Sequence, residues 1–170
     1  KELDISLLGT DSILNDYFFK LAEESRYEQA AKALKEGEEF LIENAKRKEI
    51  KTTASGLQYE ILRLGMRGVK AEKEYVVTIH YQASFINGEV YDSSIEKEPV
   101  SFPLNAPNGT IRGLHEGIER MSIGDQYKFY IPAKLAYGNS SPEGSPIPPG
   151  STLVFVIELT NLATIEGTQL

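Results

Sequence analysis

The sequence contains no cysteine among its 170 residues, which excludes disulfide bonds, thiol catalysis and metal sites built on thiolates. No apolar run approaches the ~20 residues that a membrane-spanning helix requires, so we expect no insertion into a bilayer. Glycine-rich phosphate loops of the GxGxxG and P-loop types are also missing. We therefore expect no cofactor.

Histidine is scarce, with only His80 and His115 in the chain. Nucleophilic catalysis needs a base beside the nucleophile, and histidine is the commonest base. His80 falls on the polar face of a predicted strand and His115 lies off the apolar stripe of a predicted short helix, so we expect both at the surface. Their spacing matches no metal-binding motif. The sequence predicts neither covalent catalysis nor a metal site.

The charge balance is acidic, with a formal net charge of −7 at pH 7. Nucleic acid and anionic membranes are therefore poor candidate partners. The composition, 41% hydrophobic and 25% charged, is typical of a globular protein, and the length suits one domain with an appendage. Because the sequence opens with Lys1 rather than methionine, we expect an upstream segment to have been removed.

Proline is absent from the first part of the chain, and all eight prolines lie at Pro99 or later. Residues 12–50 are rich in Ala, Leu, Glu and Lys, which favours helix. Asp11 and Ser12 can cap a first helix. Its apolar face would carry Leu14, Phe18, Leu21 and Ala22. A second helical run carries Ala30, Leu34, Gly37 and Leu41 at spacings of four, three and four.

This second stripe is thin and has a glycine near its centre, so two interpretations remain open. The helix is either a solvated element lightly docked on the next domain or a spacer and dimerisation arm. We place the arm at residues 1–50 and the second domain at residues 51–170.

From Leu57 onward the apolar residues recur with a period of two, which indicates strands. The clearest strand covers residues 75–85, and Asn87-Gly88 supplies a tight hairpin turn after it. Shorter alternating runs lie at 57–61, 89–92, 100–104, 127–131 and 153–159. One short helix at 111–121 interrupts them, with Ile111, Leu114, Ile118 and Met121 on one face. The pattern predicts an α+β domain with a mostly antiparallel sheet of five or six strands.

The loop at 136–151 is unusually long and carries half of the prolines. Long loops in compact domains are usually functional or disordered, and prolines stiffen the chain. Its apolar tip suggests the wall of a site. Several aromatic residues occupy strand positions predicted to face the core or lie at the mouth of this loop. They are Tyr81, Tyr91, Phe102, Tyr137 and Phe155. Each alone is more often a core residue, yet so small a sheet cannot bury them all, which favours an open apolar cleft.

Three motifs of the sequence are similar to those of a known family. VTIHYQASFINGEVYDSS, IRGLHEGIERMSIGDQYKFYIPAKLAYG and PIPPGSTLVFVIEL resemble the FKBP-type peptidyl-prolyl cis-trans isomerases over about residues 56–163. The segment GEEFLIENAKRKEIKTTASGLQYEIL resembles the linker of the bacterial macrophage-infectivity-potentiator-like branch, whose N-terminal helices form homodimers.

The resemblance implies a curved antiparallel half-barrel wrapped around one short helix, with the site between them and the 136–151 loop above it. Residues carried over as catalytic are Tyr81, Asp92, Tyr137 and Phe155. Residues carried over as substrate-binding are Tyr91, Val100, Phe102, Ile111, Leu114 and Ile147.

Three positions depart from the family pattern. Leu114 stands where many relatives have the tryptophan that floors the pocket, Tyr91 stands where many have phenylalanine, and Val100 replaces a phenylalanine of the small single-domain members. The helical arm is also shorter than in dimeric relatives.

The resemblance implies a peptidyl-prolyl cis-trans isomerase that assists protein folding. The alternative is a binding module or chaperone that uses the same cleft without turnover, and the change at Leu114 keeps this alternative open. Implied partners are proline-containing polypeptides, macrolide inhibitors and a second copy of the chain through the N-terminal helices. The implied location is the periplasm or cell envelope.

Overall fold

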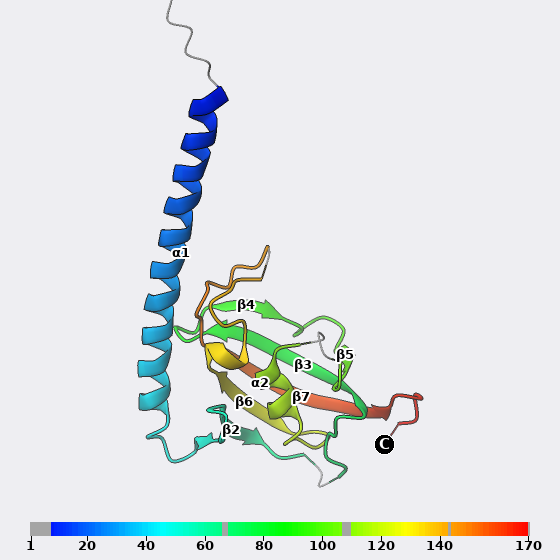
Figure 1. The fold of residues 1–170 in the computed structure, drawn as a ribbon. Coiled ribbons are helices and arrows are strands. Elements are labelled where there is room, and N and C mark those ends of the chain that lie inside the picture. Colours follow the sequence, from blue (N-terminus) through cyan, green and yellow to red (C-terminus); the bar gives the residue numbers. More distant parts are fainter. Residues whose placement is uncertain (1–7, 66–67, 107–109, 143, 170) are drawn as a thin grey trace, which may run out of the picture.

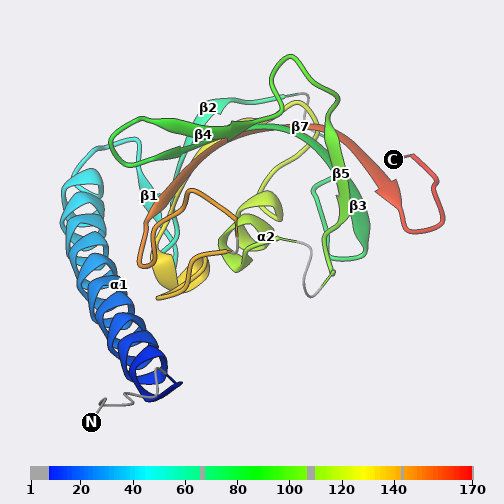
Figure 2. The same ribbon diagram turned by 90° about the horizontal axis from the view of Figure 1, so that it is seen from above.

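The computed structural model describes residues 8–65, 68–106, 110–142 and 144–169, so residues 1–7 of the predicted arm lie outside it. One long helix precedes an antiparallel sheet that curves around a short helix (Figures 1 and 2). The helices are α1 (Leu8–Asn44) and α2 (Arg112–Ile118), with a 3-10 turn at Ala133–Leu135. The strands are β1 (Lys51–Thr52), β2 (Gln58–Arg63), β3 (Tyr75–Phe85), β4 (Val90–Ser93), β5 (Val100–Pro103), β6 (Gln126–Ile131) and β7 (Leu153–Thr164). The predicted fold class is confirmed.

The seven strands of the described residues pair in the order β1-β2-β6-β7-β3-β4, and β5 also pairs with β3. All pairs are antiparallel, and the long strands β3 and β7 form the centre of the sheet, with Tyr81 opposite Ile157. The sequence predicted five or six strands. It missed β1 because this strand has only two residues, Lys51 and Thr52, in a segment without alternation.

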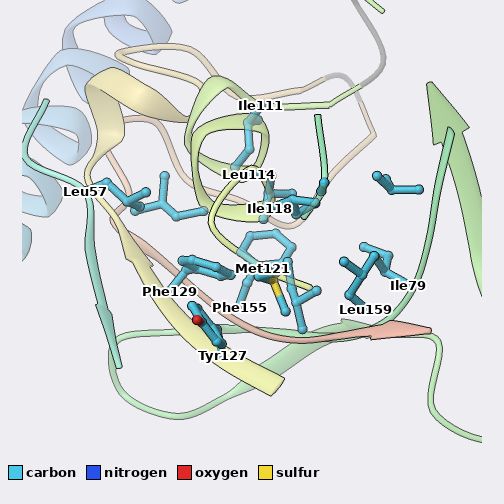
Figure 3. Close-up of a cluster of buried hydrophobic side chains, with 14 of the residues drawn as sticks. Leu57, Ile79, Ile111, Leu114, Ile118, Met121, Tyr127, Phe129, Phe155 and Leu159 are labelled. Carbon is cyan, nitrogen blue, oxygen red and sulfur yellow. The ribbon is translucent and has the colours of Figure 1, made fainter. Parts of the chain in front are cut away.

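The core lies between the concave face of the sheet and α2. Val77, Ile79 and Ala83 are buried on the inward face of β3, as their parity predicted. Figure 3 shows Leu114, Ile118 and Met121 directed from α2 and its end toward the rings of β6 and β7. Gly117 allows this close packing, because a Cβ there would lie 2.7 Å from the ring of Phe129.

Helix α1 differs from its prediction at both ends. It is one continuous helix rather than two, because the residues between the predicted pair are good helix formers and include no proline. It starts at Leu8, so Asp11 and Ser12 lie inside it and do not cap it. It ends at Asn44 rather than near residue 50. There, Asn44 Nδ2 donates a 2.9 Å hydrogen bond to Gln58 Oε1 of β2.

The two halves of α1 have different surroundings. In the C-terminal half, Ala30 and Gly37 are buried against the chain near Gly150 and Thr152, so this part is docked on the sheet domain. In the N-terminal half, Leu14, Phe18 and Leu21 are exposed, and Phe18 is 62% exposed. Figure 1 shows this half projecting away from the sheet.

The end of α1 also reverses part of the prediction for β2. Gln58 and Glu60, on the face expected to be polar, are buried, whereas Ile61 is 36% exposed. Arg47, just after α1, donates a 2.6 Å hydrogen bond to Glu60 Oε2, and the Tyr130 hydroxyl donates one of 2.9 Å to Glu60 Oε1. The polar face of β2 is thus covered and its hydrogen-bonding groups are satisfied.

Candidate active site

A cavity of about 460 Å³ opens between α2, the concave face of the sheet and the 136–151 loop, which we call the flap. Residue 143 of the flap lies outside the described residues. All ten residues predicted for the site line this one cavity, namely Tyr81, Tyr91, Asp92, Val100, Phe102, Ile111, Leu114, Tyr137, Ile147 and Phe155. The structure therefore brings together side chains from four strands, α2 and the flap.

The floor of the cavity is apolar. Ile111 and Leu114 belong to the start of α2, and Phe155 rises from β7 beneath them (Figure 3). Leu114 is 6% exposed and Phe155 is 8% exposed, so both are packed as core residues that also border the cavity. The ring of Phe155 lies 6.3 Å from that of Tyr81, in a tilted arrangement that is favourable for aromatic pairs.

The polar part of the cavity is a fixed pair at its rim. The Tyr81 hydroxyl donates a 2.6 Å hydrogen bond to Asp92 Oδ2, and the Ser93 amide donates one of 2.8 Å to Asp92 Oδ1. Burial, followed by the bond to Asp92, raises the pKa of Tyr81 from 10.0 to about 12. Tyr81 therefore keeps its proton at physiological pH, and both oxygens of Asp92 already accept hydrogen bonds.

Two further tyrosines lie under and beside the flap. Tyr91 packs its ring 4.8 Å from that of Phe85, and its hydroxyl is buried without a hydrogen-bond partner among the described residues. This burial raises the pKa of Tyr91, so it also stays protonated. Tyr137 is 41% exposed and stands at the mouth of the cavity. Part of this side chain is therefore accessible from solvent.

The flap is closed at its base by the backbone. Gly150 N donates a 2.8 Å hydrogen bond to Gly138 O, and Gly138 N donates one of 2.8 Å to Ala133 O. Gly138 and Gly150 have φ values of 61° and 78°, which glycine adopts without strain. This stem fixes where Tyr137 and Ile147 leave the loop.

Six lining residues were not predicted as site residues, namely Ile79, Ala83, Thr110, Pro142, Ser145 and Pro146. The sequence held a signal for three of them. Ile79 and Ala83 lie on the same face of β3 as Tyr81, so the alternation places them beside it. Pro146 belongs to the apolar tip of the loop, which suggested the wall of a site. The other three lie in loops, where no periodicity shows which way a side chain points.

Neither histidine reaches the cavity, but both are half-buried rather than at the surface as predicted. His80 Nδ1 lies 3.3 Å from Ser94 Oγ because the loop after β4 folds over it. His115 faces the residues near Leu104, and burial lowers its pKa. Within the described ranges, no cluster of three or more metal-ligating side chains occurs, and no helix is long and apolar enough to cross a membrane.

Comparison with known proteins agrees with this geometry. The model for FKBP-type peptidyl-prolyl cis-trans isomerases matches residues 68–160, and the model for the domain amino terminal to that isomerase matches residues 6–61. FkpA of Aeromonas hydrophila is 38% identical over 163 residues, which is 94% of this chain and 59% of that protein. A 22 kDa FKBP-type isomerase of Escherichia coli is 40% identical, over 75% of this chain and 60% of the relative.

The fold is also similar to solved structures of peptidyl-prolyl cis-trans isomerases. The crystal structure of FkpA from Escherichia coli aligns with a TM-score of 0.86 and 32% identity, over 96% of this chain and 75% of that one. An isomerase from Pseudomonas syringae aligns with a TM-score of 0.69 and 28% identity, over 78% and 95% of the two chains. Both parts of the fold therefore have counterparts in known proteins, and the chain belongs to the FKBP-type peptidyl-prolyl cis-trans isomerase family.

Proposed function

We propose that this chain is a peptidyl-prolyl cis-trans isomerase that accelerates rotation about X-Pro bonds in protein clients and so assists their folding. The observation that carries the proposal is an apolar cavity in which Asp92, the one carboxylate among the described lining residues, already accepts two hydrogen bonds. Among the described lining residues, no free carboxylate or imidazole is present to act as a base for a hydroxyl nucleophile. Such a cavity suits a reaction that breaks no covalent bond.

The physical problem is the loss of amide resonance, which sets a barrier of ~20 kcal/mol for X-Pro rotation in water. The planar ground state is more polar than the twisted transition state, because its carbonyl oxygen carries more negative charge. Water stabilises the planar form more strongly. Transfer of the bond into an apolar cavity removes that preference and lowers the barrier.

Different lining residues have different roles in binding the client and lowering this barrier. Phe155, Ile111 and Leu114 form the floor that holds the proline ring. The hydroxyl of Tyr137, a residue that is 41% exposed, donates a hydrogen bond to a carbonyl of the client. Tyr81 and Asp92 form a rigid wall, since each is already satisfied by the other. The remaining predicted residues, Tyr91, Val100, Phe102 and Ile147, close the sides.

The alternative function is binding without turnover, as a prolyl-peptide module or chaperone. Leu114 favours it, because a branched side chain offers a proline ring less flat surface than an indole does. A protease-coupled assay on a short X-Pro peptide distinguishes the two. We expect acceleration, whereas binding of the peptide without acceleration would establish the alternative.

We propose the same cavity as the site for macrolide inhibitors. Its volume of about 460 Å³ falls in the range of small-molecule pockets, and its lining is mostly apolar. Leu114 leaves the floor with a smaller contact surface than an indole would, so affinity depends on this position.

We further propose that residues 1–50 form an assembly arm and residues 51–170 the isomerase domain, with two copies joined through α1. Support comes from the exposed apolar residues of the N-terminal half, such as Ile13, Phe18 and Phe19, which an isolated helix would not leave in water. A dimer would present two cavities to one large client and gain affinity by avidity.

For location we propose the periplasm or cell envelope, supported by the resemblance to the macrophage-infectivity-potentiator-like branch. Cell fractionation with an antibody tests this directly. Recovery of the protein only in the cytoplasmic fraction would contradict it.

A further inference from the structure

Helix α1 is in direct contact with the flap of the candidate active site. A Cβ on Gly150 would lie 2.5 Å from Ala30 O and 3.0 Å from Leu34 Cγ, so the backbone of the flap touches the helix. Ala30 is buried by this contact. Figure 2 shows the flap running between α1 and α2. The position of α1 is therefore fixed relative to the cavity.

A groove lies along this contact, beside the active-site cavity. It has a volume of about 430 Å³, and its walls come from α1, the hairpin between β3 and β4, and the flap. Phe85, Ile86 and Pro148 make these walls largely apolar. Pro146 lines both the groove and the active-site cavity. The two spaces therefore adjoin at this residue of the flap.

The groove is acidic. Glu36 of α1 and Glu89 of the hairpin line it, and Asp92 lines the adjoining cavity. No lysine or arginine is among the described residues that line either space. Lys32 approaches Glu36 to 3.9 Å, but both side chains are more than half exposed, so this pair is weak.

We propose that this groove is a second client subsite, which holds the polypeptide segment flanking the proline and prefers a lysine or arginine there. The inference rests on the proposed function, because it assigns the client's proline to the main cavity. Apolar walls accommodate the stem of a long basic side chain, and the carboxylates meet its charge. The arm thus contributes to client selection within one protomer, independently of assembly.

The test uses the full chain and three peptides with the same central X-Pro bond. One is a short tetrapeptide that fits the main cavity alone. The other two extend about six residues, some 20 Å, to each side of the bond, with lysines or with glutamates in the flanks. The variant Glu36→Lys reverses a charge inside the groove. Glu38→Lys makes the same change on α1 outside it and is the matched control, since Glu38 is exposed and lines no part of the groove.

We expect the wild-type chain to turn over the lysine peptide with a higher kcat/KM than the glutamate peptide. Glu36→Lys should lower kcat/KM for the lysine peptide by roughly three- to tenfold, whereas Glu38→Lys changes it little. Turnover of the tetrapeptide should stay the same in all three proteins. The preference should also shrink as salt is added.

Equal effects of Glu36→Lys and Glu38→Lys would overturn the subsite, because they would show only a long-range effect of net charge. Equal turnover of the two long peptides by the wild-type chain would do so as well. Absence of turnover of the tetrapeptide would instead contradict the proposed function. In that case, fluorescence anisotropy of the two labelled long peptides still tests the groove, with the same order of affinities expected.

Discussion

Gly37 in α1 and Thr152 after the flap lie so close that a Cβ on the glycine would stand 2.3 Å from Thr152 Oγ1. The two residues are 115 positions apart in sequence, and this contact joins the arm to the segment that enters β7. Because Gly150 also touches α1, the base of the flap is held from the side of the arm. The arm therefore supports the position of Tyr137 and Ile147.

A larger side chain at Gly37 should disturb the site without changing any residue of the cavity. We expect Gly37→Leu to push α1 from the flap and raise KM for a tetrapeptide roughly fivefold, with a smaller change in kcat. Ala31→Leu, at an exposed position of the same helix, is the matched control.

The double variant Gly37→Ala with Thr152→Ala separates this effect from general damage. Alanine alone at position 37 meets Thr152 Oγ1 and should raise KM, whereas removal of that oxygen leaves only Thr152 Cβ, at 3.1 Å. The double variant should therefore bring KM back close to the wild-type value. A wild-type KM in Gly37→Leu, with a normal melting temperature, would show that the flap does not depend on α1.

A substitution at Leu114 tests whether this residue forms the floor of the cavity. We expect Leu114→Trp to tighten the binding of a macrolide or prolyl ligand by about 1 kcal/mol, close to fivefold in Kd, from added apolar contact. Isothermal titration calorimetry measures the change, and thermal unfolding confirms that the variant is folded. Weaker binding by a folded variant would mean that the neighbouring side chains have closed the space.

The pair Tyr81 and Asp92 predicts a pH dependence of stability. The folded protein raises the pKa of Tyr81 from 10.0 to about 12, so it holds this proton more tightly than the unfolded chain. The stabilisation is complete below pH 10 and is lost as the pH rises from 10 through 12.

Denaturant unfolding of the wild-type chain and of Tyr81→Phe measures this dependence. Tyr127 and Tyr130 also have raised pKa values, but Tyr81 does not contribute to either shift, so their titration cancels in the difference. Tyr81 contributes only a minor part of the raised pKa of Tyr91, which burial dominates. The difference in unfolding free energy should be constant up to about pH 10 and change above it. A constant difference through pH 12 would contradict the raised pKa of Tyr81.

The exposed half of α1 predicts the assembly state. We expect light scattering to give the mass of a dimer for the full chain at micromolar concentration. Phe18→Glu should shift it toward the monomer, because it places a charge in the apolar face. Lys20→Glu on the same helix is the control and should remain dimeric. A monomeric wild-type chain over the whole concentration range would refute the arm's role in assembly.

The sheet and the cavity were predictable because the alternation of apolar and polar residues along a strand shows which side chains face the core. Once Tyr75 to Phe85 alternate, every inward residue of β3 is assigned, and Tyr81 must face α2. The family motifs then placed residues from distant segments, such as Asp92 and Phe155, around the same space. All ten lie there, although their individual roles remain proposals.

The docking of α1 was not predictable in the same way. The glycine at position 37 weakened the apparent stripe, yet its missing side chain is what permits the contact with Thr152. On β2, a period of two separates the two faces of the strand but does not tell which face another element covers. Gln58 and Glu60 occupy the polar positions of this alternation, and the end of α1 buries them. Contacts between elements far apart in sequence leave little local signal.

The most direct measurement of the central claim is the rate of cis-trans exchange in a short X-Pro peptide, followed by NMR with the wild-type chain and with Phe155→Ala and Tyr137→Phe. Phe155 lines the floor at 8% exposure, so its truncation should cost about 3–5 kcal/mol of stability as well as activity. The exchange is therefore measured at a temperature where unfolding curves show each variant to be folded.

We predict that the wild-type chain accelerates the exchange and that both variants lower kcat/KM, Phe155→Ala by more than tenfold and Tyr137→Phe by roughly fivefold. The acceleration should be the same from pH 6 to pH 9, because no free acid or base takes part. Wild-type exchange rates in both folded variants would contradict the assignment of catalysis to this cavity.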